Sequence, residues 1–318
     1  MDLLGNLLLT LRITDSAICH FELVPPWGFE MPRWPGDRAI LFSPVDEPCW
    51  LSVEGGTPVC VEPGDSALVL GGLPHVCQSD VGAPVQVISG VWQSRGLPEL
   101  GEAPAERGPI RFPWQPLAAT GAAAQRILAL AVVIEDAEHN PVLSALPRPV
   151  LVRQSAGRMF PWLPSALQFL LQEEHAATAG YAVTERHLAT LIFTSLVRAH
   201  VVEEGHLSGS WLRGLADPKI GKALSLIHAA PGRPWTLQAL AEDCGMSRTH
   251  FARRFAALVG RTPMAHLAMV RMNEAGRQLV AGTPVGQVAE NVGFQSDWSF
   301  RRAFMQHYGT TPRRFARA

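Results

Sequence analysis

The sequence lacks any run of eighteen apolar residues without a charge, the length that a membrane-spanning helix needs. Its leucine-rich start, residues 1–13, carries an acid at Asp2 and has no basic segment of the kind that opens a secretory signal. Cysteine is scarce: five in 318 residues is an odd number that does not suit a disulfide framework. Proline and glycine follow no period, which excludes a collagen-like chain. We therefore expect a cytoplasmic globular protein with no membrane span.

Charge is distributed unevenly along the chain. Residues 1–212 contain 12 Lys and Arg against 22 Asp and Glu, whereas residues 213–318 contain 15 against 6. The overall net charge of −1 thus conceals an acidic part of −10 and a basic part of +9. Apolar residues make up 47% of the sequence, which is enough for more than one core.

The acidic part predicts strands first and helices later. Short apolar runs between turn residues predict strands at Ala39–Phe42, Cys49–Val53, Pro58–Val61, Ala67–Leu70 and Val85–Val91, which together indicate a small β-barrel or sandwich. Helical periodicity follows at Gly121–Glu138, Pro164–Ala177 and Thr184–Glu204, the last with Thr184 as its N-cap. The last helix has an apolar stripe, which either packs in a core or mediates self-association: Leu188, Leu191, Ile192, Leu196 and Val197. Residues 203–211 are typical of a linker.

The basic part contains an internal repeat. Leu240–Met246 (LAEDCGM) matches Val288–Phe294 (VAENVGF), and six later positions also agree after one extra residue in the second copy. Those positions are Phe251, Arg253, Phe255, Gly260, Thr262 and Pro263, matched by Phe300, Arg302, Phe304, Gly309, Thr311 and Pro312. Each copy predicts a short helix, a glycine turn, a serine N-cap and a second helix that ends at glycine. This is a helix-turn-helix written twice.

The second helix of each copy has two unlike faces. Its phenylalanines are four residues apart and predict a buried face, which leaves an arginine-bearing face for a DNA major groove. The candidate DNA-binding residues are Arg248, Thr249, His250, Ala252, Arg253, Ser296, Asp297, Trp298, Arg301 and Arg302. Between the copies, Pro263–Val280 predicts one long helix, which would place the two recognition helices in successive major-groove turns, about 10 bp apart.

Residues 211–318 resemble the DNA-binding domain of the AraC/XylS family of bacterial transcription regulators. The resemblance is carried by WTLQALAEDCGMSRTHFARRF (235–255), VGRTP (259–263), VRMNEAGRQLV (270–280), VAENVGFQS (288–296) and FRRAFMQHYGTTP (300–312). It implies base-facing positions at Thr249, Ala252 and Arg253 in the first copy and at Asp297, Trp298 and Arg302 in the second. Ala252 can offer only an apolar contact, and Asp297 would repel phosphate unless it accepts a hydrogen bond from a cytosine amine.

Residues 1–200 resemble the cupin-type domain that precedes this DNA-binding domain in one branch of the family. Glu62-Pro63-Gly64-Asp65 and Leu73-Pro74-His75 are similar to the second half-motif of a cupin barrel. The HxH half-motif expected around Leu41–Val53 is absent, and metal chemistry needs about three imidazoles and a carboxylate. The resemblance thus implies an α+β chain: a cupin-like sensor barrel at 1–118, a helical dimerisation segment at 119–204 and a double helix-turn-helix domain at 211–318.

Five residues of the predicted barrel are candidates for sensing: Cys19, Cys49, Cys60, His75 and Cys77. They are interpreted in four ways: as buried small hydrophobes, as a redox-reactive thiol cluster, as a soft-metal site at His75 and Cys77, or as the neighbours of an apolar ligand pocket.

The function we expect is that of a sequence-specific DNA-binding regulator, and not of an enzyme. It would respond to a small-molecule, redox or metal signal, act as a homodimer, bind promoter DNA and activate RNA polymerase, as the family resemblance implies. The alternative is a metal-dependent cupin oxidoreductase fused to a DNA-binding module.

Overall fold

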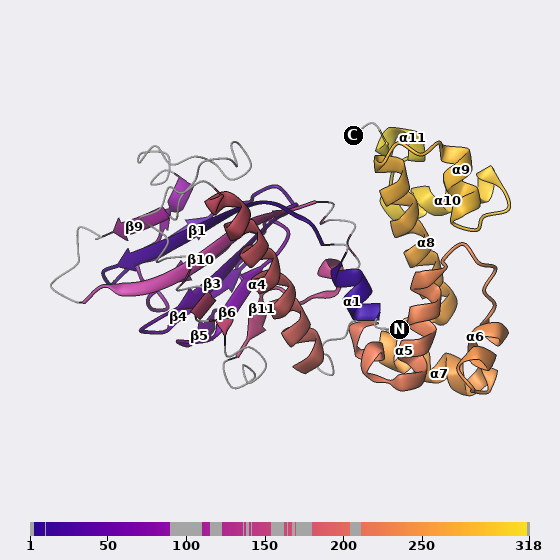
Figure 1. Ribbon diagram of the computed structural model, residues 1–318, viewed down its shortest axis with the longest axis horizontal. Helices are drawn as coiled ribbons and strands as arrows, with labels where there is room; N and C mark the ends of the chain where they lie inside the picture. The colour runs from indigo at the N-terminus through magenta and orange to yellow at the C-terminus, as the bar shows by residue number, and fades with distance from the viewer. Residues whose placement is uncertain are drawn as a thin grey trace. The chain divides into compact units, whose positions relative to one another are not determined.

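A computed structural model describes residues 3–9, 11–89, 110–114, 123–135, 137, 140, 142–153, 162, 163, 165, 166, 169, 180–203 and 211–316. Over these residues the chain is α+β, with a sheet-rich N-terminal region and a helical C-terminal region (Figure 1). It divides into two compact units. One unit contains residues 11–138 and 147–203, and the other contains residues 1–10, 139–146 and 204–318. The N-terminal segment and a short internal segment therefore cluster with the helical region.

The sheet-rich unit contains two sheets. The larger has the strand order β11-β6-β3-β10-β1-β9, in which β1 and β9 are parallel and the other neighbours are antiparallel. Its strands are β1 (Ile13–Leu23), β3 (Arg38–Pro44), β6 (Ser66–Val69), β9 (Ile110–Trp114), β10 (Gln125–Ile134) and β11 (Val150–Val152). The smaller sheet has the order β5-β4-β7-β2-β8, and its strands are β2 (Gly28–Met31), β4 (Cys49–Val53), β5 (Val59–Val61), β7 (His75–Gln78) and β8 (Gln86–Val87).

The two sheets enclose a shared apolar core. It takes alternate side chains from strands of both sheets, as the pleat of a strand requires. The rings of Phe21 on β1 and Phe29 on β2 lie 6.2 Å apart, and the ring of Trp27 lies 6.1 Å from that of Phe29. The buried Trp27 indole donates from Nε1 to Oε1 of Gln125 at 2.6 Å, which ties the start of β2 to the start of β10. The two sheets thus pack around one apolar core.

The helix predicted at Gly121–Glu138 is wrong, because Gln125–Ile134 within this segment forms the central strand β10. Apart from Arg126 and Val133, the residues of β10 are buried. A strand that is covered on both faces has a continuous apolar run, and periodicity alone cannot distinguish such a run from a buried helix. The predicted strand Val85–Val91 is also shorter than expected, since β8 ends at Val87.

Helix α4 (Tyr181–Glu203) confirms the last predicted helix of the acidic part and lies against β1 and β11 (Figure 1). It begins three residues before Thr184, so Thr184 lies within the first turn and is not the N-cap. In its apolar stripe Ile192, Leu196 and Val197 are buried, whereas Leu191 is 49% exposed. The helix predicted at 164–177 falls almost entirely outside the described residues.

The second unit is helical, and its arrangement confirms the two predicted helix-turn-helix motifs. Its helices are α1 (Leu3–Leu8), α5 (Pro218–Ala229), α6 (Leu237–Asp243), α7 (Arg248–Val259), α8 (Pro263–Val280), α9 (Val285–Asn291), α10 (Asp297–Tyr308) and α11 (Pro312–Phe315), with short 3₁₀ segments at Leu143–Ala145 and Trp211–Ala216. Helix α8 begins and ends at the predicted residues and runs between the α6–α7 and α9–α10 motifs (Figure 1). Helix α1 packs on α5.

None of the helices in the described part of the chain has the length and apolar character that a membrane crossing requires.

Candidate DNA interface and sensor core

The first helix-turn-helix is built by its caps and its turn. The Thr236 hydroxyl accepts from the Ala239 amide and starts α6. Gly245 then adopts a left-handed φ of 62°, a conformation that costs glycine little, and α7 follows. Phe251 and Phe255 of α7 are fully buried. The opposite face is exposed at Arg248, Thr249, His250 and Arg253, while Ala252 is half-buried.

The second helix-turn-helix repeats this geometry with different surface residues. The turn residue Gly293 has a φ of 81°, and the Ser296 hydroxyl accepts from the Ser299 amide at the start of α10. Phe300 and Phe304 are fully buried. The exposed residues are Ser296, Asp297, Trp298, Arg301 and Arg302. The structure thus leaves nine of the ten candidate DNA-binding residues exposed on or beside the two recognition helices.

Two arginine side chains on the exposed face of α10 contact neighbouring side chains of the same helix. The Arg301 guanidinium donates to the Asp297 carboxylate at 3.1 Å, one helical turn away. Asp297 therefore stands beside a cation, which reduces its repulsion of a phosphate group. The guanidinium carbon of Arg302 lies 5.4 Å from the centre of the Trp298 ring, in a cation–π contact.

Arg254, next to the candidate residue Arg253, has a different role. Its guanidinium binds the buried carboxylate of Asp217, the N-cap of α5, with Nε 2.8 Å from Oδ2. The same carboxylate accepts from the amides of Lys219 and Ile220. Burial raises the pKa of Asp217, but the hydrogen bonds from Ile220, Arg254 and Lys219 outweigh this effect and hold the pKa below its usual value. Arg254 thus anchors the first recognition helix to α5.

Two lysines of α5 attach the same helix to the turn of the first motif. Lys219 donates from Nζ to the Gly245 carbonyl at 3.0 Å, and Lys222 donates to the Asp243 carbonyl at 2.5 Å. The sequence patterns do not predict that these residues of α5 anchor the first motif. The pair Asp217-Pro218 is a helix-start signal that could have located the cap, but no pattern in the sequence indicates the partners of its side chain.

The loop at 230–235, before the first motif, contacts the second motif directly. The Arg271 side chain of α8 donates to the carbonyls of Pro231, at 2.8 Å, and Arg233, at 2.9 Å. In this loop Gly232 lies so close to the second turn that a Cβ atom would overlap the carbonyl oxygen of Asn291. The two motifs are therefore joined by a backbone contact as well as by α8.

A histidine pair lies in the core of the helical unit. The Nε2 atoms of His228 and His266 are 3.1 Å apart, and the Trp211 ring stacks on His228 with a centroid distance of 5.0 Å. Nδ1 of His266 is buried and has no partner among the described residues, so we place its proton on Nε2, donating to His228. Burial lowers the pKa of His228 to about 4 and that of His266 to about 3. Both rings are neutral packing residues.

In the sheet-rich unit the core contains a small apolar cavity. Its volume is about 20 Å³, room for roughly one water molecule. It is lined by Phe21, Leu23, Trp27, Phe29, Met31, Phe42, Cys77, Ile88 and Ile127. The Trp27 indole N–H already donates to Gln125, so no free polar group faces this space from the lining. Its lining suits an apolar molecule, and a volume of about 20 Å³ would have to grow before such a molecule could fit.

The candidate cysteines do not form one cluster. Cys19, Cys49 and Cys77 belong to the apolar core, while Cys60 lies on β5 and is partly exposed. A hydrogen bond between the Cys49 and Cys77 side chains, together with burial, raises the pKa of the Cys77 thiol well above its usual value. The Cys77 thiol therefore stays protonated at neutral pH.

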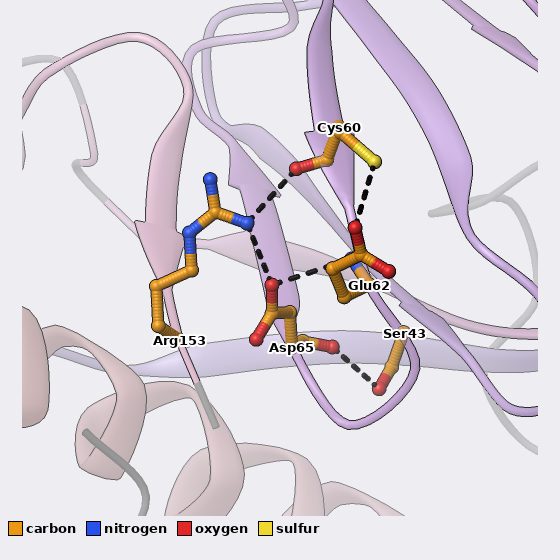
Figure 2. Close-up of polar contacts among 5 residues, drawn as sticks. All are labelled: Ser43, Cys60, Glu62, Asp65 and Arg153. Atoms are coloured by element: carbon orange, nitrogen blue, oxygen red, sulfur yellow. Dashed lines mark hydrogen bonds and ion pairs between the residues drawn. The ribbon is translucent and has the colours of Figure 1, made fainter. Parts of the chain in front are cut away.

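Cys60 sits in a polar network at the edge of the smaller sheet (Figure 2). Its thiol donates to the Glu62 carboxylate at 3.4 Å. Burial raises the pKa of this thiol most, and the neighbouring Glu62 carboxylate raises it further. Its carbonyl accepts from Arg153 at 3.0 Å, and Arg153 also donates to Oδ2 of Asp65 at 2.7 Å (Figure 2). The Ser43 hydroxyl donates to the Asp65 carbonyl. This network links β11 to the turn before β6.

His75, the remaining sensor candidate, is buried, and its ring is 5.5 Å from the ring of Phe42. Nδ1 donates to the Leu73 carbonyl at 2.8 Å, which leaves Nε2 as an acceptor without a partner among the described residues. Burial lowers its pKa to about 4. In the part of the chain that the structure describes, no group of three or more His, Cys, Asp or Glu side chains is arranged to hold a metal ion. The surroundings of His75 therefore do not fit the metal centre of a catalytic cupin.

The two outward helices and the separate β-core are the features of a DNA-binding regulator with a second, sheet-rich domain. The family model described as Cupin matches residues 2–202, and the model described as Helix-turn-helix domain matches residues 240–318. The chain belongs to the AraC-type family of helix-turn-helix transcriptional regulators with an N-terminal cupin domain.

Similar proteins include two curated regulators. The HTH-type transcriptional regulator AlkR of Acinetobacter baylyi is 26% identical, over 99% of each chain. The RCS-specific HTH-type transcriptional activator RclR of Escherichia coli is 34% identical over 48% of this chain, and the match spans about half of its own length (53%). Among solved structures, the chain is similar to ToxT from Vibrio cholerae with bound unsaturated fatty acid, at 11% identity, a TM-score of 0.37 and coverage of 96% of each chain.

Proposed function

We propose that the protein binds promoter DNA by placing α7 and α10 in successive major-groove turns, about 10 bp apart. One observation carries this proposal. In both motifs a pair of fully buried phenylalanines fixes the recognition helix so that its arginine-bearing face points outward. Arg253 and Arg302 occupy matching positions on these faces and would bind guanine or phosphate.

The test is equilibrium binding of the full chain to duplexes obtained by selection from a random pool. Replacing Arg253 or Arg302 by Ala should weaken binding about ten-fold, in line with the loss of one charge-assisted contact. Arg277→Ala is the matched control, because Arg277 is exposed on α8 but tied to Glu274 by hydrogen bonds of 2.7 and 2.8 Å. Affinity should also fall steeply with salt. Selection that enriches no sequence, or binding that ignores salt, would refute the proposal.

For the sensor domain we infer an apolar small-molecule effector, bound where the small cavity now lies. The all-apolar lining supports this assignment over a metal, which would find no set of ligands around His75. The raised pKa values of the Cys60 and Cys77 thiols argue against fast redox reactivity. Because the cavity is so small, binding must widen the core, and this widening would be the signal.

Three measurements separate these inputs. Apolar compounds of graded size should raise the melting temperature of the sheet-rich unit, and Trp27→Phe should change which sizes bind best. Replacing Cys19, Cys60 and Cys77 singly by Ser should leave the effector response intact. Near-stoichiometric iron in the purified protein, with turnover of a substrate, would instead favour the alternative of an oxidoreductase.

We further propose that the protein is a cytoplasmic homodimer that activates transcription through RNA polymerase and has no enzymatic activity. Exposed apolar residues of α4, Val183, Leu191 and Val202, support a self-association surface on this helix. Leu191→Arg should shift the molecular mass in solution from dimer to monomer. An unchanged mass would exclude this part of α4 as the interface.

A further inference from the structure

The second recognition helix has an exposed apolar surface that the first lacks. Trp298 is 70% exposed and Met305 is 42% exposed. Both line a groove of about 400 Å³, together with Val285, Arg301, Arg302, Thr311, Pro312 and Arg313. The matching positions of α7 are Thr249 and Ala256, which are small. This apolar surface is therefore a property of the second motif only.

The groove faces away from the protein core. Phe300 and Phe304 point inward and are fully buried, and Trp298 and Arg302 lie on the opposite side of α10. Three arginines line the same groove, at 301, 302 and 313. An apolar protein partner would gain little from three cations at the contact, whereas a polyanion with apolar groups in its groove matches both features.

Thymine is the one base that presents an apolar group in the major groove, its 5-methyl. The other base edges present hydrogen-bond donors and acceptors. Met305 is a poor hydrogen-bonding partner for these groups, and Trp298 has only one donor, its indole N–H. We propose that α10 selects thymine by packing Trp298 and Met305 against this methyl group, a proposal that rests on the DNA-binding function proposed above. Arg301, Arg302 and Arg313 would bind phosphate or neighbouring base edges.

This recognition makes the two half-sites chemically unlike. Helix α7 presents Thr249 and Arg253 beside half-buried Ala252 and can read base edges by hydrogen bonds at close range. Helix α10 presents a large indole, which Arg302 covers on one side by its cation–π contact. The half-site that α10 reads should therefore contain a thymine whose methyl group contacts Trp298 and Met305.

The experiment removes one methyl group at a time from the DNA. A duplex is first selected with the full chain, and each thymine is then replaced singly by 2′-deoxyuridine. At one or more positions the wild-type protein should bind about four-fold more weakly, which corresponds to about 0.8 kcal/mol for one buried methyl. Trp298→Ala should weaken binding to the thymine duplex and remove the difference between thymine and deoxyuridine. Thr249→Ala, at the matching position of α7, should keep the difference.

The outcomes separate the two proposals. If selection enriches no duplex, the DNA-binding proposal fails. If a duplex is enriched but no deoxyuridine substitution matters, or if Trp298→Ala and Met305→Ala both retain the discrimination, thymine reading by this groove is wrong. If Trp298→Ala binds DNA as the wild type does but loses transcriptional output, the groove binds a protein partner instead. Trp298 is largely exposed, so its replacement leaves the fold intact, which circular dichroism checks.

Discussion

Gly232 and Gly293 meet backbone to backbone, and a Cβ atom on Gly293 would overlap the carbonyl oxygen of Gly232. The contact brings the loop before the first helix-turn-helix onto the turn of the second. Arg271 holds the same loop through its two carbonyl contacts. The separation of the recognition helices thus depends on this contact as well as on α8.

Gly232→Ala should force the loop away from the second turn and change the orientation of the two motifs. We expect affinity for a complete operator to fall at least ten-fold, because one helix then meets its groove out of register, while affinity for a duplex with one half-site changes little. Titration of both duplexes with the full chain measures this.

Gly286→Ala is the matched control for this substitution. Gly286 lies in α9 with no atom within 4 Å of where its Cβ would be, and alanine suits a helix better by up to about 1 kcal/mol. Binding should be unchanged. Wild-type affinity in the Gly232 variant would show that α8 alone sets the spacing.

Neighbouring arginines of α7 should have separate effects. Asp217→Asn removes a charged cap and the anchor of Arg254, so the free energy of unfolding should fall by about 2 kcal/mol. Arg254→Ala should also destabilise the helical unit. Arg253→Ala, on the exposed face, should weaken DNA binding and leave stability unchanged. Urea unfolding and DNA titration of the same three variants provide the comparison.

The sign of the pH dependence follows from the lowered pKa of Asp217. Its contribution is complete above the ordinary aspartate pKa of 3.8 and disappears as the pH falls through the lower value of the folded state. If the Asp217→Asn variant were as stable as the wild type at neutral pH, Asp217 would not anchor the first recognition helix through Arg254.

The helical region was predictable because its signals are local. Thr236, Gly245 and Ser296 act where caps and turns are specified by neighbouring residues, and the phenylalanine pairs are buried as expected. Strand β4 coincides with its predicted range, Cys49–Val53. Pairing between distant strands is not local, which is why the sequence pattern predicts a helix where β10 lies.

The contacts that tie the functional parts together were not predictable. Arg254 and Arg253 are adjacent and chemically identical, yet one anchors a helix and the other faces outward. Arg254 is the anchor because its side chain reaches Asp217, 37 residues away in the sequence. The contact of Gly232 with the turn at Gly293 likewise depends on where the second motif lies relative to the loop at 230–235. Sequence patterns therefore predict the helices and strands and which of their faces are buried. They do not predict which side chains contact each other across the folded chain.

Acidification should weaken the helical unit through its histidine pair. The pKa values of His228 and His266, about 4 and about 3, lie below the usual 6.5. The unfolded state therefore binds more protons, and stability should fall as the pH drops below 6.5, by about 1.4 kcal/mol per pH unit for each histidine. The loss should stop once the folded rings are themselves protonated.

Urea unfolding of the full chain at several pH values between 4.5 and 6.5 measures this slope in the transition of the helical unit. His266→Gln keeps a donor for His228 but does not titrate, so the slope should become shallower by about 1.4 kcal/mol per pH unit. Gly286→Ala, which changes no titratable group, should leave the slope unchanged. Equal slopes in all three proteins would contradict the assignment.

Thiol accessibility tests the sensor domain. Cys60 is partly exposed, whereas Cys19, Cys49, Cys77 and Cys244 are buried, so iodoacetamide should label Cys60 first. Labelling should nevertheless be slower than for free cysteine, because burial and Glu62 raise the pKa of the Cys60 thiol and reduce its thiolate fraction. Mass spectrometry of the digested protein, sampled over time at neutral pH, gives the rate for each cysteine.

Glu62→Gln should speed the labelling of Cys60 several-fold, since the amide no longer disfavours a thiolate 3.4 Å away. Glu54→Gln is the control, because Glu54 is paired with Arg33 in the same unit and should not affect the rate. Cys77 should stay unlabelled until the core unfolds, since its thiol is hydrogen-bonded to Cys49 inside the barrel. Rapid labelling of Cys77 in the native protein would mean that the core opens spontaneously, and a redox input to the sensor would then be favoured over an apolar ligand.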